Sequence, residues 1–70
     1  MESFKLRAGE DFIRLGQVLK AVGFVDSGAE TKEVIQDGQV KVNGETELRR
    51  GRKLYKGDIV SYEGREIKIG

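Results

Sequence analysis

The chain begins with a segment in which apolar and polar residues alternate. Phe4 and Leu6 fall on one side of residues 2–7, which is the pattern of a half-buried strand. From Asp11 the apolar positions change to helical spacing. They are Phe12, Leu15, Val18, Leu19 and Val22. This spacing predicts a helix of about three turns that ends at Gly23, where a left-handed C-cap fits. Gly16 inside this helix costs about 1 kcal/mol relative to alanine, so we expect another backbone segment to lie close to it.

A second helix is predicted after the short connection FVDS. Ser27 and Glu30 have the spacing of a capping box, in which both side chains accept hydrogen bonds from amides at the helix start. Its apolar stripe consists of Ala29, Val34 and Ile35. Gly38 is placed to end the helix. Because the connection is so short, the two helices are expected to cross as a compact pair.

The remaining residues have the turn signals and period-two segments of a small antiparallel sheet. Val40 and Val42 point to one side, and Asn43-Gly44 predicts a type I′ hairpin because both residues tolerate a positive φ. The other predicted elements are a return arm over 45–48, a turn at 56–58, a strand over 59–62, a turn at 63–64 and a strand over 65–69. The pattern predicts a single α+β domain over 1–70, with two N-terminal helices packed on a small, mostly antiparallel β-sheet.

Length and composition limit the class of function. Seventy residues leave no room for a separate catalytic lobe. The absence of Cys and His excludes disulfides, a thiolate zinc site and the usual imidazole base. No apolar run approaches the roughly 20 residues of a membrane span. We therefore expect a cytoplasmic protein that is not an enzyme, has no cofactor, metal or small-molecule substrate, and makes no contact with a membrane.

The formal net charge of +1 conceals a segregation of charge. The basic segment, residues 49–56 (RRGRKLYK), has no acidic residue, and the rest of the chain is acidic on balance. Its most closely spaced cations are Arg49, Arg50, Arg52 and Lys53. Their mutual repulsion is relieved when a polyanion binds, and arginine grips phosphate in bidentate fashion. The alternative is a solvated loop at a sheet edge, where cations prevent strand aggregation.

The start of the second helix is a further candidate anion site. Ser27, Gly28 and Ala29 expose backbone amides at the positive end of the helix dipole, and Lys32 adds charge one turn along. Every capped helix has such amides, so an ordinary helix start is the alternative.

The aromatic residues have two expected roles. Phe4, Phe12 and Phe24 fit apolar faces and are expected in the core. Tyr55 lies beside the cations, where it either stacks on a base or ribose or packs half-buried against a strand.

Read continuously, the chain resembles the S-four RNA-binding domain, the domain named after protein four of the small ribosomal subunit. The matching positions are Arg14-Leu15, Leu19, Gly23, Ser27, Val34-Ile35, Gly38, the segment Val40-Lys41-Val42-Asn43-Gly44 and Gly57-Asp58-Ile59-Val60. They lie within about residues 12–62, and the most specific piece is the V-x-V-N-G hairpin after a helix that begins at Ser. The chain looks like the short, free-standing bacterial members, which also carry a run similar to RRGRKLYKGD.

The resemblance implies an α-L RNA-binding motif that binds structured RNA, often ribosomal or transfer RNA, with the ribosome as a candidate site of action. We also expect the protein to be a monomer. The candidate contacts are Ser27, Gly28, Lys32, Lys41, Asn43, Gly44, Arg49, Arg50, Arg52, Lys53, Tyr55 and Lys56. The family commonly has Asp where this chain has Gly16 and Arg where it has Gly28. We therefore expect phosphate binding to shift toward the basic segment, on the same face as the second helix start.

Two other classes of function stay open. A small β-grasp carrier protein has a similar hairpin, but it would end in Gly-Gly, whereas this chain ends in Ile69-Gly70. Its hairpin would also lie near the start of the chain. A protein-interaction module would bind an acidic partner through the basic edge.

Overall fold

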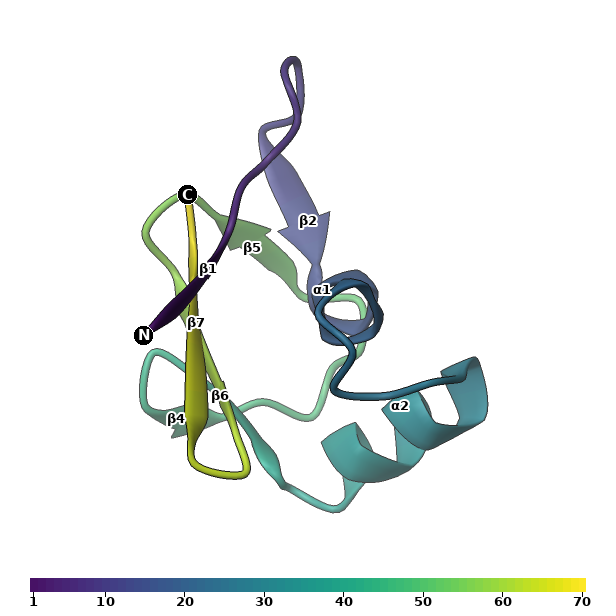
Figure 1. Ribbon diagram of the computed structural model, residues 1–70. Coiled ribbons are helices and arrows are strands. Elements are labelled where there is room, and N and C mark those ends of the chain that lie inside the picture. Colours follow the sequence, from purple (N-terminus) through teal and green to yellow (C-terminus); the bar gives the residue numbers. More distant parts are fainter.

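The computed structural model describes residues 1–70 as two helices, a five-stranded sheet and a two-stranded ribbon (Figure 1). The helices are α1 (Leu15–Ala21) and α2 (Gly28–Gln36). The strands are β1 (Glu2–Phe4), β2 (Phe12–Arg14), β3 (Val40–Val42), β4 (Glu45–Thr46), β5 (Lys53–Tyr55), β6 (Ile59–Tyr62) and β7 (Arg65–Ile69). The sheet has the order β1-β7-β6-β3-β4, and β2 pairs with β5 apart from it.

The sheet is antiparallel except at one edge, where β1 runs parallel to β7. Both predicted hairpins are present. Asn43 and Gly44 have φ values of 52° and 85°, and Glu63 and Gly64 have values of 50° and 77°, as a type I′ turn requires. The short loops set the register of these strand pairs, so Val42 lies opposite Glu45 and Tyr62 lies opposite Arg65.

The prediction for the first helix is wrong at its start. Phe12–Arg14 form strand β2, which pairs with β5, and α1 begins only at Leu15. The register places Ile13 opposite Leu54, and both side chains are buried. Pairing with a strand about 40 residues away therefore overrides the helical spacing of the local sequence. Two strands thus precede the helices, and β5 was not among the predicted strands.

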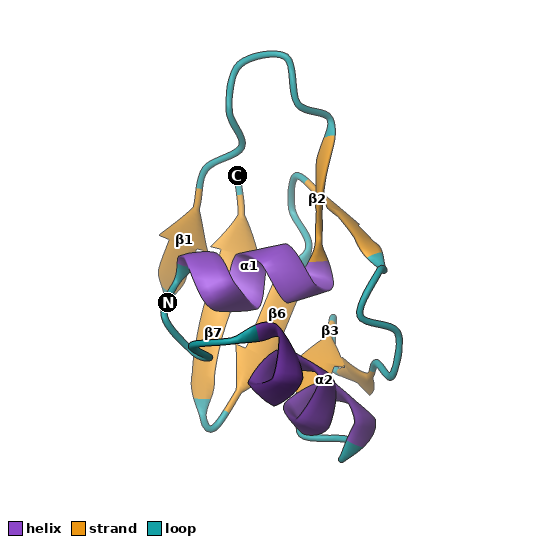
Figure 2. Cartoon of the chain, turned by 90° about the vertical axis from the view of Figure 1, so that its right-hand side faces the viewer, coloured by secondary structure: helices purple, strands orange, loops and turns teal.

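The two helices pack on the same face of the sheet (Figure 2), as predicted. Their buried side chains meet those of the sheet in one core. Its members are Ile13, Leu15, Val18, Leu19, Val25, Val34, Ile35, Val40, Val42, Leu54, Val60, Tyr62 and Ile69. Phe4 and Phe24 are partly buried against this core. Phe12 is only partly buried, on the β2–β5 ribbon.

Both predicted helix ends are present, and one inward position of α2 differs from the prediction. Gly23 and Gly38 have positive φ values of 79° and 77° after the two helices. Ala29 is exposed, whereas Thr31 is buried. The Thr31 hydroxyl donates a hydrogen bond of 2.8 Å to the Ser27 carbonyl, so its polar group is satisfied in the core. Neither helix has the length and apolar character needed to cross a membrane.

Candidate nucleic-acid interface

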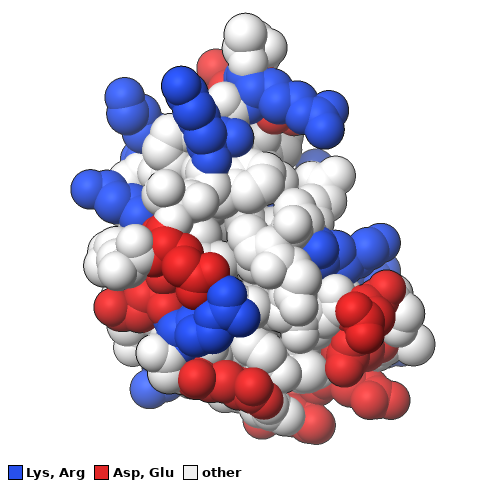
Figure 3. Space-filling model, viewed as in Figure 1, with Lys and Arg blue, Asp and Glu red and all other residues white.

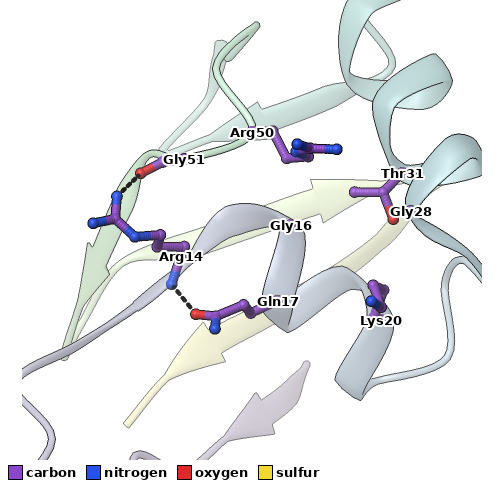
Figure 4. A pocket seen from close by; sticks show the side chains of 8 residues that line it. All are labelled: Arg14, Gly16, Gln17, Lys20, Gly28, Thr31, Arg50 and Gly51. Atoms are coloured by element: carbon purple, nitrogen blue, oxygen red, sulfur yellow. Dashed lines mark hydrogen bonds between the residues drawn. The ribbon is translucent and has the colours of Figure 1, made fainter.

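A hollow of about 390 Å³ lies between α1, the start of α2 and the basic segment (Figure 4). We call it the α1–α2 hollow. It is lined by Arg14, Gly16, Gln17, Lys20, Gly28, Thr31, Arg50 and Gly51. Three of these residues are cations, and none is acidic or apolar. The lining therefore combines positive charge with three glycines, of which Gly28 has no other atom within 4 Å of where its Cβ would lie.

The two cations of α1 are held at the ends of the helix. Arg14 is the N-cap residue, and its backbone N–H donates to Gln17 Oε1 at 3.1 Å. Its Nη1 donates to the Gly51 carbonyl at 2.8 Å, which ties α1 to the basic segment (Figure 4). Lys20 lies in the last turn, where a cation is favoured by the helix dipole.

Gly16 brings Arg50 into the hollow. The Gly16 N–H donates to the Arg50 carbonyl at 3.0 Å, and the preceding amide, Leu15 N–H, donates to the Arg52 carbonyl at 2.9 Å. A Cβ atom at position 16 would lie 2.7 Å from Arg50 Cγ, which is closer than carbon atoms can approach. The expected backbone contact is thus present, and the Arg50 side chain occupies the space that Gly16 leaves.

The start of α2 supplies the opposite wall. Ser27 Oγ accepts a hydrogen bond of 3.2 Å from Glu30 N–H, and Glu30 Oε1 accepts one of 2.7 Å from Asp26 N–H. The Ser27 half of the predicted capping box is therefore present, but the Glu30 carboxylate accepts from the amide before the N-cap and not from that of Ser27. Gly28 and Ala29 occupy the first helical positions, whose amides have no partner inside the helix. A Cβ at Gly28 would meet nothing within 4 Å, so this backbone is open to a ligand.

Two cations of the basic segment are paired with one carboxylate. Glu47 is only 6% exposed. It accepts hydrogen bonds from Arg49 Nε and Nη2, both at 3.1 Å, and from Arg52 Nη1 at 2.9 Å. The hydrogen bonds from Arg49, and then those from Arg52, lower the pKa of Glu47 to about 2 despite its burial. Part of the positive charge expected for phosphate is thus neutralised within the protein.

The four clustered cations therefore do not line a single hollow. Arg50 lines the α1–α2 hollow, together with Gly28 from the second helix start. Arg49, Arg52 and Lys53 line a neighbouring hollow that we call the ribbon hollow. Its complete lining is Arg14, Arg49, Gly51, Arg52 and Lys53. Because Arg14 and Gly51 line both hollows, the two form one continuous basic surface.

Lys32 extends this surface along α2. It lines a third hollow with Arg50 and the exposed Leu48. Arg50 therefore lies between Lys32 on one side and the α1 cations on the other. On the face drawn in Figure 3, most Asp and Glu lie in the lower half, whereas Lys and Arg gather at the upper end and also lie among the acidic residues below.

The hairpin candidates lie elsewhere, because Lys41, Asn43 and Gly44 line none of these three hollows. The Asn43 side chain is used inside the fold: its Nδ2 donates to Asp58 Oδ1 at 3.1 Å and its Oδ1 accepts from Ile59 N–H at 2.9 Å. Gly44 completes the turn, and Lys41 is exposed on β3.

The last two candidate residues lie at the end of β5 and in the turn after it. Tyr55 ends β5 and is exposed, with 48% of its surface accessible, so it is not the half-buried packing residue of one alternative. Lys56 is exposed in the turn that leads to β6.

Sequence reasoning missed Arg14, Gln17 and Lys20 as members of this surface. In the predicted first helix, these three residues fall between the apolar positions, on the opposite, polar face. Arg14 and Lys20 do stand out as two cations on one polar face, and that was the available signal. These two cations could not be recognised as part of a binding surface without the position of α2, because the pairing of the two helices turns that face toward the α2 amides.

The family model for the S4 domain matches residues 4–70, and the chain belongs to this family, the S-four domain described above. Membership over nearly the whole chain removes the reason for considering a β-grasp carrier.

Particular relatives are similar over most of their length. The Bacillus subtilis (strain 168) protein named "Probable ribosome maturation protein RlbA" is 46% identical over 54 residues, which are 77% of this chain and 76% of that protein. YbcJ of Escherichia coli (strain K12) is 39% identical over 57 residues, 81% of each chain. The solution structure of YbcJ from E. coli, described as revealing an αL motif involved in RNA-binding, has a TM-score of 0.70 and 36% identity. That match covers 99% of this chain and 86% of the YbcJ chain.

Proposed function

We propose that this protein is a non-enzymatic RNA-binding module that binds the phosphate backbone of structured RNA in the α1–α2 hollow. The observation that carries the proposal is that Arg14, Lys20 and Arg50 line one hollow together with Gly28 at the start of α2, with no acidic residue in the lining. The S4 family membership and the RNA-binding motif described for YbcJ support it.

The hollow has the chemistry that a phosphate group requires. Backbone amides at a helix N-terminus and the helix dipole favour an anion, and arginine donates paired hydrogen bonds to phosphate oxygens. Gly28 leaves the α2 amides uncovered. Gly28 stands where the family commonly has an arginine. Arg50 supplies a positive charge to the hollow in its place.

Structured RNA suits this surface better than an extended strand. The loop that carries Arg50 and Arg52 is bonded through their carbonyls to the first amides of α1, and A-form RNA presents its phosphates in a fixed arrangement while its deep major groove hides the base edges. The relative named for ribosome maturation supports ribosomal RNA, on the ribosome or its precursors, as the target. We expect the protein to act in the cytoplasm as a monomer.

A salt titration tests the phosphate mechanism. If Arg14, Lys20, Arg50 and Lys53 each neutralise one phosphate, the logarithm of affinity for a ribosomal RNA hairpin falls with the logarithm of salt concentration with a slope of roughly −3 to −4. Arg50→Ala should weaken binding and reduce the magnitude of the slope by about 1.

Lys68→Ala is the matched control, because it removes the same charge from an exposed position of β7 between the inward-facing Ile67 and Ile69. We expect it to leave the slope nearly unchanged. A flat salt dependence of the unmodified protein, or equal effects of Arg50→Ala and Lys68→Ala, would contradict the proposed site.

A further inference from the structure

The outer face of the β2–β5 ribbon combines aromatic rings with cations. The register places Phe12 opposite Tyr55 and Arg14 opposite Lys53, with the buried Ile13–Leu54 pair between them. Since side chains alternate along a strand, these four residues share the face that points away from the core. This face is not needed to bury the core.

Of the two aromatic rings on this face, that of Tyr55 is accessible to a ligand. The Phe12 and Tyr55 rings pack with centroids 5.9 Å apart and planes inclined at 50°. Lys53 Nζ and Arg14 Cζ lie 4.9 Å and 5.7 Å from the Phe12 centroid, so cations cover Phe12 and leave Tyr55 accessible. The Tyr55 backbone is fixed, because its N–H donates to Asp58 Oδ2 at 2.7 Å. The point from which the ring projects is therefore fixed.

The ribbon face is continuous with the proposed phosphate site. Arg14 lines the α1–α2 hollow, and both Arg14 and Lys53 line the ribbon hollow. An RNA strand whose phosphates follow these cations would pass directly beside the aromatic pair.

We propose that the ribbon face binds an unpaired nucleobase of the same RNA, which stacks on Tyr55 while Arg14 and Lys53 contact the adjacent phosphates. The proposal rests on the proposed function and adds a preference for RNA in which a helix adjoins an unpaired nucleotide. Unstacked bases bind to aromatic side chains in this way regardless of base type. A second copy of this chain is a poorer occupant, because its own Arg14 and Lys53 would face the same cations.

The test compares two RNA hairpins of identical stem, one fully paired and one with a single bulged adenosine. The unmodified protein should bind the bulged hairpin more tightly. Tyr55→Ala should remove that advantage, a loss of roughly 5- to 150-fold for one stacked base, while binding of the paired hairpin and its salt slope stay unchanged. Tyr55→Phe should retain the advantage, and an abasic bulge should abolish it.

Three outcomes would overturn the inference. One is equal affinity of the unmodified protein for both hairpins. Another is an equal loss on both hairpins in Tyr55→Ala, with circular dichroism showing the variant folded. The third is a dimer in sedimentation velocity that Tyr55→Ala dissociates. Failure of the unmodified protein to bind either hairpin would instead contradict the proposed function itself, so the two failures are distinguishable.

Discussion

Glu47 stabilises the fold and also neutralises part of its positive charge. Replacing it by Gln should therefore lower the stability of the fold and increase the positive charge available to RNA. The carboxylate is nearly buried and receives four hydrogen bonds, three from the guanidinium groups of Arg49 and Arg52 and one from the Arg49 backbone N–H. Glu47→Gln removes the charge while keeping the shape of the side chain. We therefore expect a less stable protein that binds RNA more tightly at low salt, because two cations lose their internal counter-charge.

The magnitude follows from the pKa of Glu47, which the fold lowers from 4.5 to about 2. Each pH unit in this interval corresponds to about 1.4 kcal/mol, which sets an upper limit of about 3 kcal/mol. Arg49 is largely exposed, so solvent screening should reduce the contribution to about 1–2 kcal/mol.

The sign of the pH dependence follows from the direction of the shift. A carboxyl whose pKa is lower in the folded state stabilises the fold above its unfolded pKa, and that stabilisation disappears as pH falls. The difference in free energy of unfolding between the unmodified protein and Glu47→Gln should therefore be constant above about pH 4.5 and shrink as pH falls toward 2.

Urea denaturation at several pH values, followed by circular dichroism, measures this difference directly. Glu66→Gln is the matched control, because Glu66 is an exposed glutamate on β7, and its effect on stability should be within about 0.5 kcal/mol. Equal stability of Glu47→Gln and the unmodified protein at pH 7, or a difference that persists undiminished at pH 2, would refute the reasoning.

Further predictions concern the hollow, the hairpin and the helix start. Gly16→Ala should displace Arg50, whose Cγ would lie 2.7 Å from the new Cβ; RNA affinity should fall toward that of Arg50→Ala, and a double-mutant cycle should show that the two changes are not additive. Asn43→Ala should lower the free energy of unfolding by about 1–3 kcal/mol, because Asp58 and the Ile59 amide lose their partners. The salt slope of RNA binding should not change in this variant. Ser27→Ala should cost about 1 kcal/mol through loss of the N-cap, measured by thermal unfolding, with Ser27→Asp restoring most of it.

The sequence by itself determined the features that depend on a few neighbouring residues. Asn43-Gly44 specifies a hairpin because its conformation is set within the turn, and Gly23, Gly38 and Ser27 mark helix ends by bonds that span three or four residues. The alternation of Ile67 and Ile69 likewise identifies the buried side of β7. Such signals gave the fold class, the order of most elements and the family resemblance.

Only the tertiary structure decided which cations act together. The pairing of β2 with β5 converts the expected first turn of a helix into a strand and brings Arg14 to Gly51. The packing of α1 against α2 turns Lys20 toward the α2 amides. The Glu47 carboxylate pairs with Arg49 and Arg52, two of the four clustered cations. These relations join residues that are distant in sequence and depend on which side chains a folded core brings within a few ångströms. No local pattern encodes them.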